Sequence, residues 1–184
     1  MKKQLKQLKQ LKKQAGITLM EVIAGLLIIG LVVAGALSLF GSADSSQKSN
    51  QMLSDMTALR SAVKGMYAGQ GGYGTANLNG VLKTANRIPA TMTADASTPP
   101  VITHSMNGTA TITGTSGGAQ FSIAITNIPT AVCVQLLSNS SSGWASVQVG
   151  TAAAITAFPI SPATAASTTN CAAAANNTIT FIGA

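Results

Sequence analysis

The stretch QAGITLMEVIAGLL, residues 14–27, places one carboxylate, Glu21, at the front of a long apolar run. Glu21 is the only charged residue in 17–40, and no polar side chain interrupts 22–37. About 20 apolar residues in a helix suffice to cross a bilayer, so the run predicts a membrane-spanning helix. A buried soluble helix is the alternative, but such helices are rarely apolar on every face for so long. An unpaired acid in lipid is costly, which indicates a function for Glu21.

The charged residues on either side of the run predict its orientation. Six of the nine lysines lie within residues 1–13, whereas only Asp44 and Lys48 follow closely behind the run. The positive-inside rule then keeps the amino terminus in the cytoplasm and places the rest of the chain outside the inner membrane. Apart from this head, five basic residues face four acidic ones. The net charge of +7 therefore does not indicate a nucleic-acid-binding protein, although a lysine-rich arm could bind phosphates.

Two cleavage sites are compatible with this amino terminus. The small-x-small triplet at 34–36 could be a signal-peptidase site that follows an apolar segment. Cleavage between Gly16 and Ile17 would instead leave the apolar segment on the mature protein. The carboxylate near the front of the run and the long basic head favour the second site.

The residues around Gly16 resemble the prepilin cleavage motif of type IV pilins and type II secretion pseudopilins. A basic leader, Gly16, the hydrophobic Ile17, Glu21 four residues further on and an apolar stretch are all present. The resemblance implies that a membrane aspartyl prepilin peptidase removes the leader, residues 1–16, and methylates the new amine of Ile17.

Two roles are open to Glu21. An amine and a carboxylate about 4 Å apart attract by ~4 kcal/mol at an effective dielectric constant near 20, before desolvation is subtracted. Glu21 lies one helical turn from Ile17 and could neutralise the amine of its own chain. The resemblance implies the intermolecular version, in which Glu21 pairs with the Ile17 amine of a neighbouring subunit and sets the axial register, as single buried polar groups do in coiled coils.

The helix is expected to continue beyond the apolar half, which is 17–40, through an amphipathic half at 41–67. Glycines in 68–74 then end it. Asp55, Arg60 and Lys64 lie mostly off the apolar stripe. The stripe has spacings of 4, 3, 4 and 3 and consists of Met52, Met56, Leu59, Val63 and Met66.

The remainder predicts a connecting loop and an antiparallel sheet. Residues 68–100 include a short helix with Leu78, Val81, Leu82 and Ala85 on one face. In 101–184, the pair Asn107-Gly108 predicts a two-residue hairpin turn. Period-two alternation predicts strands around Phe121, Ile123 and Ile125, around Trp144, Val147 and Val149, and around Ile179 and Phe181. The expected fold is α+β, with a long amino-terminal helix under an antiparallel β-sheet head.

The composition disfavours an enzyme. No Asp, Glu, Lys or Arg follows Asp95, and His104 is the one histidine. Acid–base catalysis, metal binding and phosphate binding need clustered titratable groups, so neither a cofactor nor a metal is expected. His104 is expected to be an exposed or partly packed strand residue.

Cys133 and Cys171, the only two cysteines, are expected to form a disulfide, because an exported head is oxidised and a zinc site would need two more ligands. The segments FSIAITNIPTAVCVQLL and CAAAANNTITFIGA resemble the head of type IVb pilins, the group of the toxin-coregulated pilin. There a strand leads into a helix with the first cysteine, and the second cysteine precedes the last strand. The resemblance implies that residues 133–171 form the D-region, which carries subunit contacts and variable surface.

These patterns together predict a structural subunit, a major pilin, of a type IV pilus used for adhesion, aggregation or conjugation. The precursor would lie in the inner membrane and the assembled homopolymer outside the cell. The resemblance implies an assembly ATPase, an inner-membrane platform protein and an outer-membrane secretin as partners. The alternatives are a minor pilin, a type II secretion pseudopilin, or a secreted adhesin or binding module that is cleaved after Ala36.

Overall fold

The computed structural model of the chain describes residues 19–140, 143–173 and 175–184. They form two compact units, one that ends at Ala43 and one that comprises Asp44–Ala184. Helix α2, Leu19–Met66, contributes to both units. Its end follows from the glycines after it, because Gly69 adopts a φ of +84°, which L side chains rarely adopt. The predicted long amino-terminal helix is confirmed.

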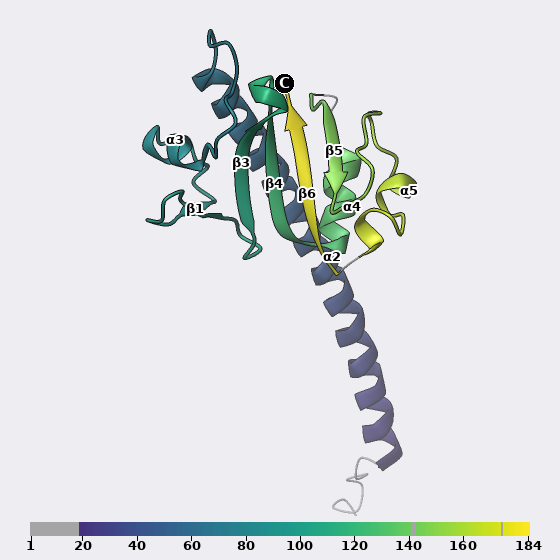
Figure 1. Cartoon of the computed structure of the whole chain (residues 1–184). Coiled ribbons are helices and arrows are strands. Elements are labelled where there is room, and N and C mark those ends of the chain that lie inside the picture. Colours follow the sequence, from purple (N-terminus) through teal and green to yellow (C-terminus); the bar gives the residue numbers. More distant parts are fainter. Residues whose placement is uncertain (1–18, 141–142, 174) are drawn as a thin grey trace, which may run out of the picture. The chain divides into compact units, whose positions relative to one another are not determined.

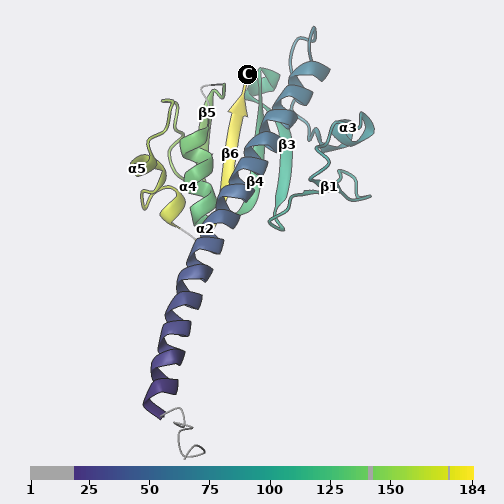
Figure 2. The same cartoon turned by 180° about the vertical axis from the view of Figure 1, so that it is seen from behind.

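The second unit, which we call the head, contains one six-stranded antiparallel sheet. The strands lie side by side in the order β1-β2-β3-β4-β6-β5 (Figure 1). Figure 2 shows the carboxy-terminal part of α2 lying across one face of this sheet. The elements are α3 (Asn79–Thr84), β1 (Thr93–Ala94), β2 (Ile102–Thr103), β3 (Thr109–Thr115), η2 (Ser116–Gly118), β4 (Gln120–Pro129), α4 (Thr130–Asn139), β5 (Ser146–Val149), α5 (Pro162–Ala165), η3 (Cys171–Ala173) and β6 (Asn176–Gly183).

The core of the head forms where the predicted stripe of α2 meets the inward face of the sheet. Side chains alternate between the two faces of a strand, so every second residue of β3 and β6 is buried. The same holds for β4 up to Ile125, after which a bulge before Ile128 shifts the pattern by one residue. Each large apolar side chain removed from water in this way stabilises the head by roughly 1.5–3 kcal/mol. The predicted α+β class is therefore confirmed, with a core that includes Met52, Met56, Leu59, Val63, Ile112, Phe121, Ile123, Ile125, Ile179 and Phe181.

The turn between β2 and β3 differs from the predicted two-residue turn. Thr103 pairs with Thr109, and inside that pair the His104 N–H donates to the Gly108 carbonyl at 3.0 Å. The Asn107 N–H donates to the His104 carbonyl, also at 3.0 Å. The loop thus has three residues, with Asn107 in the left-handed region at φ 56°, which is the other common hairpin solution for an Asn-Gly pair.

Helix α3 buries only part of the predicted face. Leu78 and Leu82 are buried, but Val81 and Ala85 are exposed. The polar Asn79 takes the place of the expected apolar residues in the interior. Its Nδ2 donates to the carbonyls of Pro100 and Ala110, and its Oδ1 accepts from the Ile112 N–H. A side chain that satisfies three backbone groups at once can be buried, because no hydrogen bond to water is lost without replacement.

Candidate assembly segment and head surface

The described part of the first unit, residues 19–43 of α2, is here called the assembly segment. Its large apolar side chains are exposed, with Leu31 at 77% and Leu39 at 75%. By length and composition α2 is long and apolar enough to cross a membrane. None of the residues in its most apolar 18-residue stretch is buried. Side chains of this kind need lipid or other protein around them.

Glu21 lies in the first turn of α2 and is exposed. A carboxylate there interacts favourably with the partial positive charge of a helix amino terminus. Gly16 and Ile17 lie outside the described residues, so cleavage after Gly16, methylation of Ile17 and the pairing of Glu21 remain predictions. The alternative triplet at 34–36 lies inside α2.

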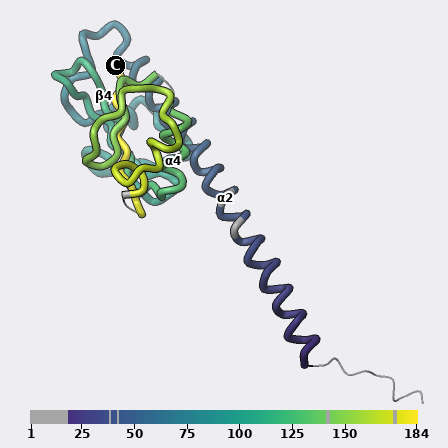
Figure 3. Tube along the Cα trace, turned by 90° about the vertical axis from the view of Figure 1, so that its right-hand side faces the viewer, coloured from purple at the N-terminus to yellow at the C-terminus, as the bar shows by residue number. Residues whose placement is uncertain are grey.

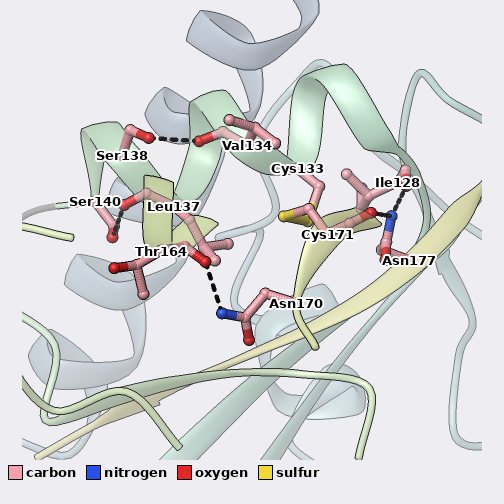
Figure 4. The surroundings of a disulfide bond; sticks show 10 residues. All are labelled: Ile128, Cys133, Val134, Leu137, Ser138, Ser140, Thr164, Asn170, Cys171 and Asn177. Carbon is pink, nitrogen blue, oxygen red and sulfur yellow. Dashed lines mark hydrogen bonds between the residues drawn. A yellow bond between two sulfur atoms is a disulfide. The ribbon is translucent and has the colours of Figure 1, made fainter. Parts of the chain in front are cut away.

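The disulfide is confirmed. Cys133, on α4, is joined to Cys171, whose Cα lies 5.7 Å away, and both residues are fully buried. Figure 4 shows the bond surrounded by α4 on one side and by the residues before β6 on the other. The Asn177 Nδ2 donates to the carbonyls of Cys171 and Ile128 at 3.2 and 3.4 Å. The bridge therefore joins the end of the loop-rich segment that follows α4, green to yellow in Figure 3, back to α4.

A cation from α2 packs against an aromatic ring that precedes β5. The Arg60 guanidinium carbon lies 5.2 Å from the centre of the Trp144 ring, within the range of a cation–π interaction. A Cβ at Gly143 would lie only 2.3 Å from Arg60 Nη1, so glycine leaves the space that the guanidinium occupies. The position of Arg60 off the apolar stripe does not predict this contact, because nothing in the spacing relates residue 60 to residue 144.

His104 is buried, which corrects the expectation of an exposed or partly packed strand residue. It is 3% exposed and begins the hairpin loop. Its Nε2 bonds to the Thr126 carbonyl at 2.9 Å, and its Nδ1 accepts from the Met106 N–H at 3.3 Å. Burial lowers the pKa of the imidazole, against smaller opposing effects of the Thr126 carbonyl and of Asp55. The neutral ring with its proton on Nε2 satisfies both bonds.

Asp55 is also more buried than its place off the stripe indicates, at 6% exposed. Its Oδ1 accepts from the Thr91 hydroxyl at 2.6 Å. Burial raises the pKa of this carboxyl, while the Thr91 bond and the charge of a protonated His104 act in the opposite direction. In the part of the chain that the structure describes, no three His, Cys, Asp or Glu residues are placed to hold a metal ion.

The comparisons with known proteins agree with this architecture. Among solved structures, the chain is similar to the crystal structure of TcpA, a type IV pilin from Vibrio cholerae El Tor biotype, with a TM-score of 0.54 and 15% identity. The match covers 75% of this chain and 99% of that one. The fold is that of a type IV pilin, a class of structural proteins.

The family follows from the sequence of the head. The family model described as PilS N terminal matches residues 46–184, and the chain belongs to this PilS family of type IV pilins. No curated protein matches the sequence. The resemblance to type IV pilins is thus confirmed, and membership of the type IVb group stays a prediction.

Proposed function

We propose that this chain is the structural subunit of a type IV pilus, made as an inner-membrane precursor with a cytoplasmic amino terminus and polymerised into an extracellular fibre. We further propose that it is the major subunit and that the fibre serves adhesion, aggregation or conjugation. The pilin fold and the family membership support a structural role over an enzymatic one.

The observation that carries this proposal is the exposed apolar surface of the assembly segment, attached to a pilin head. In the precursor, lipid would surround side chains such as Leu26, Leu31 and Leu39. In a fibre the same side chains would pack against the assembly segments of neighbouring subunits. One surface then serves both states, since transfer from lipid to protein exchanges one apolar environment for another.

Cleavage of the precursor would create the charged amine with which Glu21 is proposed to pair. Prepilin peptidase would cleave after Gly16, which frees the amine of Ile17 for methylation, and Glu21 would pair with that amine on a neighbour. The assembly ATPase, the platform protein and the secretin would extract, stack and export the subunits. A minor pilin or a pseudopilin would share the same cleavage and pairing.

Substitution of Glu21 tests the pairing. We expect Glu21→Gln to leave the precursor in the membrane and the head folded, but to reduce fibre yield at least tenfold, because the amine would lack its counter-charge. Fibres sheared from cells and quantified by immunoblot measure the yield, and Glu21→Asp is the control that keeps the charge. Normal fibre yield from Glu21→Gln would contradict the pairing.

The mature amino terminus and the composition of the fibre test the remaining alternatives. Mass spectrometry should find a product that begins with a methylated Ile17, whereas a secreted adhesin would begin with Leu37. Sheared fibres should consist mainly of this chain. A trace amount in fibres built from another subunit would instead identify a minor pilin.

A further inference from the structure

The loop between β2 and β3, residues 104–108, is attached to β4 by side-chain hydrogen bonds. Ala110 and Ile125 form the pair of β3 and β4 that lies nearest to this loop. Just beyond Ile125 a bulge shifts the register of β4, and a bulge leaves residues without a partner in the ladder. The two residues in the bulge, Thr126 and Asn127, bind the loop instead. We call the loop and these contacts the hairpin clasp.

Hydrogen bonds from both sides hold the clasp closed. The His104 Nε2 donates to the Thr126 carbonyl at 2.9 Å, and the Asn127 Nδ2 donates to the Met106 carbonyl at 2.8 Å. The Thr109 N–H donates to the Thr126 Oγ1, also at 2.8 Å. Asn127 makes its bond from the left-handed region of the backbone, at φ 58°. The bulge of β4 and the loop therefore fit each other through specific polar contacts.

His104 can take part in the clasp only while its ring is neutral. The residue is 3% exposed, and its Nδ1 accepts from the Met106 N–H at 3.3 Å. Nε2 needs a proton to donate to Thr126, so the neutral tautomer with its proton on Nε2 makes both bonds. A second proton would lie on Nδ1 and face the Met106 N–H. Two donors would then oppose each other, and a charge would be buried without the water that hydrates it outside.

The surroundings of the ring do not compensate for this charge. A Cβ at Gly108 would lie 2.5 Å from the His104 Nε2, so the backbone lies directly against the ring. Residues 96–132 contain no ionisable side chain other than His104. From α2, the charge of Asp55 favours the protonated ring, but burial lowers the pKa of His104 by more. Burial also raises the pKa of Asp55, so this negative charge weakens as the pH falls.

From the single tautomer that fits, the buried ring and the bulge that faces it, we propose that the hairpin clasp is an acid-sensitive device, which releases the loop from β4 when His104 takes up a second proton. Release brings the charged ring into water and exposes Met106, which is buried in the closed clasp. The core pairs of β3 and β4, such as Ile112 with Ile123, lie outside the clasp. The surface of the head thus changes in mild acid while its core stays folded. The device lies wholly in the head and does not depend on fibre formation.

Hydrogen exchange of the full mature chain in detergent tests the release. Below about pH 6.5, the protection of the Met106 and Thr109 amides should fall by up to about tenfold per pH unit, because the open loop binds the proton with an ordinary histidine pKa. Protection is the intrinsic exchange rate divided by the measured rate, so the direct effect of pH on exchange cancels. Dilute urea should lower the protection of the core amide of Ile123 but leave that of Met106 almost unchanged, because release exposes little surface. Equal urea dependence of the two amides would show global unfolding and overturn the proposal.

Two variants separate the ring from the rest of the clasp. His104→Gln should remove the pH dependence of protection at Met106 and Thr109. Asn127→Gly is the matched control, because glycine tolerates the left-handed backbone while the bond to the Met106 carbonyl is lost. This variant should lower protection by the same factor at pH 7 and pH 5, and so keep the dependence on pH. The parental pH dependence in His104→Gln would overturn the proposal.

A measurement on the unmodified chain does not depend on the variants folding. His104 is the one histidine, so the imidazole signals of an NMR titration belong to a single residue. The ring should titrate with a pKa below its ordinary value, and the protection of Met106 should be lost over the range in which the ring becomes protonated. Protonation of the ring without any change at Met106 would overturn the proposal. Glu21→Gln should lose fibres but keep the pH response of the clasp, which separates this proposal from the proposed function.

Discussion

Asn79, Asp55 and His104 are buried polar residues whose hydrogen bonds join different elements of the head. Asn79 joins α3 to β3 and to the loop before β2, and Asp55 joins α2 to Thr91. His104 joins the β2–β3 loop to β4. Each of these contacts is between residues far apart in the sequence. Local periodicity therefore could not predict them.

Asn79→Ala should destabilise the head by about 2–4 kcal/mol. The substitution leaves the Ile112 N–H and the carbonyls of Pro100 and Ala110 without the side-chain partner that they have now, and unpaired buried polar groups are costly. Denaturant unfolding followed by circular dichroism measures the loss. Asn50→Ala, on an exposed position of α2, should stay within about 0.5 kcal/mol of the parent. Equal stability of the two variants would contradict the role of Asn79.

The buried imidazole predicts that the head loses stability in mild acid. The pKa of His104 is lower in the folded head than its ordinary value near 6.5. As the pH falls through about 6.5, the unfolded chain binds the proton first, so the free energy of unfolding decreases by at most about 1.4 kcal/mol per pH unit. His104→Gln should flatten this slope between pH 7 and pH 5, as measured by unfolding at each pH.

Asp55 provides the control for that experiment because its effect on stability changes with pH in the opposite direction. Burial raises the pKa of Asp55, so the folded head binds this proton more readily than the unfolded chain. Its contribution to stability increases as the pH falls toward its ordinary pKa. Asp55→Asn should therefore leave the loss between pH 7 and pH 5 in place or make it steeper. A His104→Gln head with the same pH slope as the parent would show that another group titrates.

The disulfide is the main covalent constraint on the elements of the head. It joins α4 to η3 across 38 residues, and closing a loop of this length stabilises a fold by about 4 kcal/mol in the chain-entropy model. Cys133→Ala/Cys171→Ala should lower the free energy of unfolding by about this amount. Reducing agent should destabilise the parent similarly and leave the double variant unchanged. A loss of less than about 1 kcal/mol would show that packing around α4 suffices.

Among the helices and strands, regular apolar spacing predicted the buried residues correctly, whereas the turn and the short helix α3 were predicted only in part. The stripe of α2 and the alternation in β4 and β6 correctly placed core residues such as Met56, Phe121 and Phe181. The turn at Asn107 was located correctly, but its length depends on the pairing of Thr103 with Thr109. The buried face of α3 was predicted correctly for Leu78 and Leu82 but not for Val81 and Ala85, because the polar Asn79 is buried instead. The length of the turn and the buried face of α3 depend on contacts with residues far away in the sequence, and the spacing of residues within one segment does not show these contacts.

The candidate sites show the same division. The sequence motif indicated Glu21 and the cysteine count indicated the disulfide, since both depend on residue type and order. The hollow lined by Thr151, Asn170 and Thr178 was not predicted, because it is formed by three segments that folding brings together. The contact of Arg60 with Trp144 was missed for the same reason.

The chain as a whole divides into an apolar segment and a head with its own core, which predicts that residues 44–184 fold alone. All the buried apolar residues of the core belong to this unit. A chain that begins at Asp44 should therefore be soluble without detergent, unfold cooperatively and keep its disulfide, but form no fibres. Size-exclusion chromatography measures solubility and the absence of fibres, and thermal unfolding with and without reducing agent measures cooperativity and the presence of the disulfide. Aggregation of this fragment would show that the assembly segment is needed for the head to fold.

The sheet and the disulfide region have one more property that follows from their neutrality. Arg87 is the last lysine or arginine of the chain, and β1 to β6 all come after it. Proteases that cut after basic residues find no bond to hydrolyse beyond the one that follows Arg87, even when the head is unfolded. In the fibre proposed above, the head would therefore resist trypsin-like proteases through its sequence as well as through its folding.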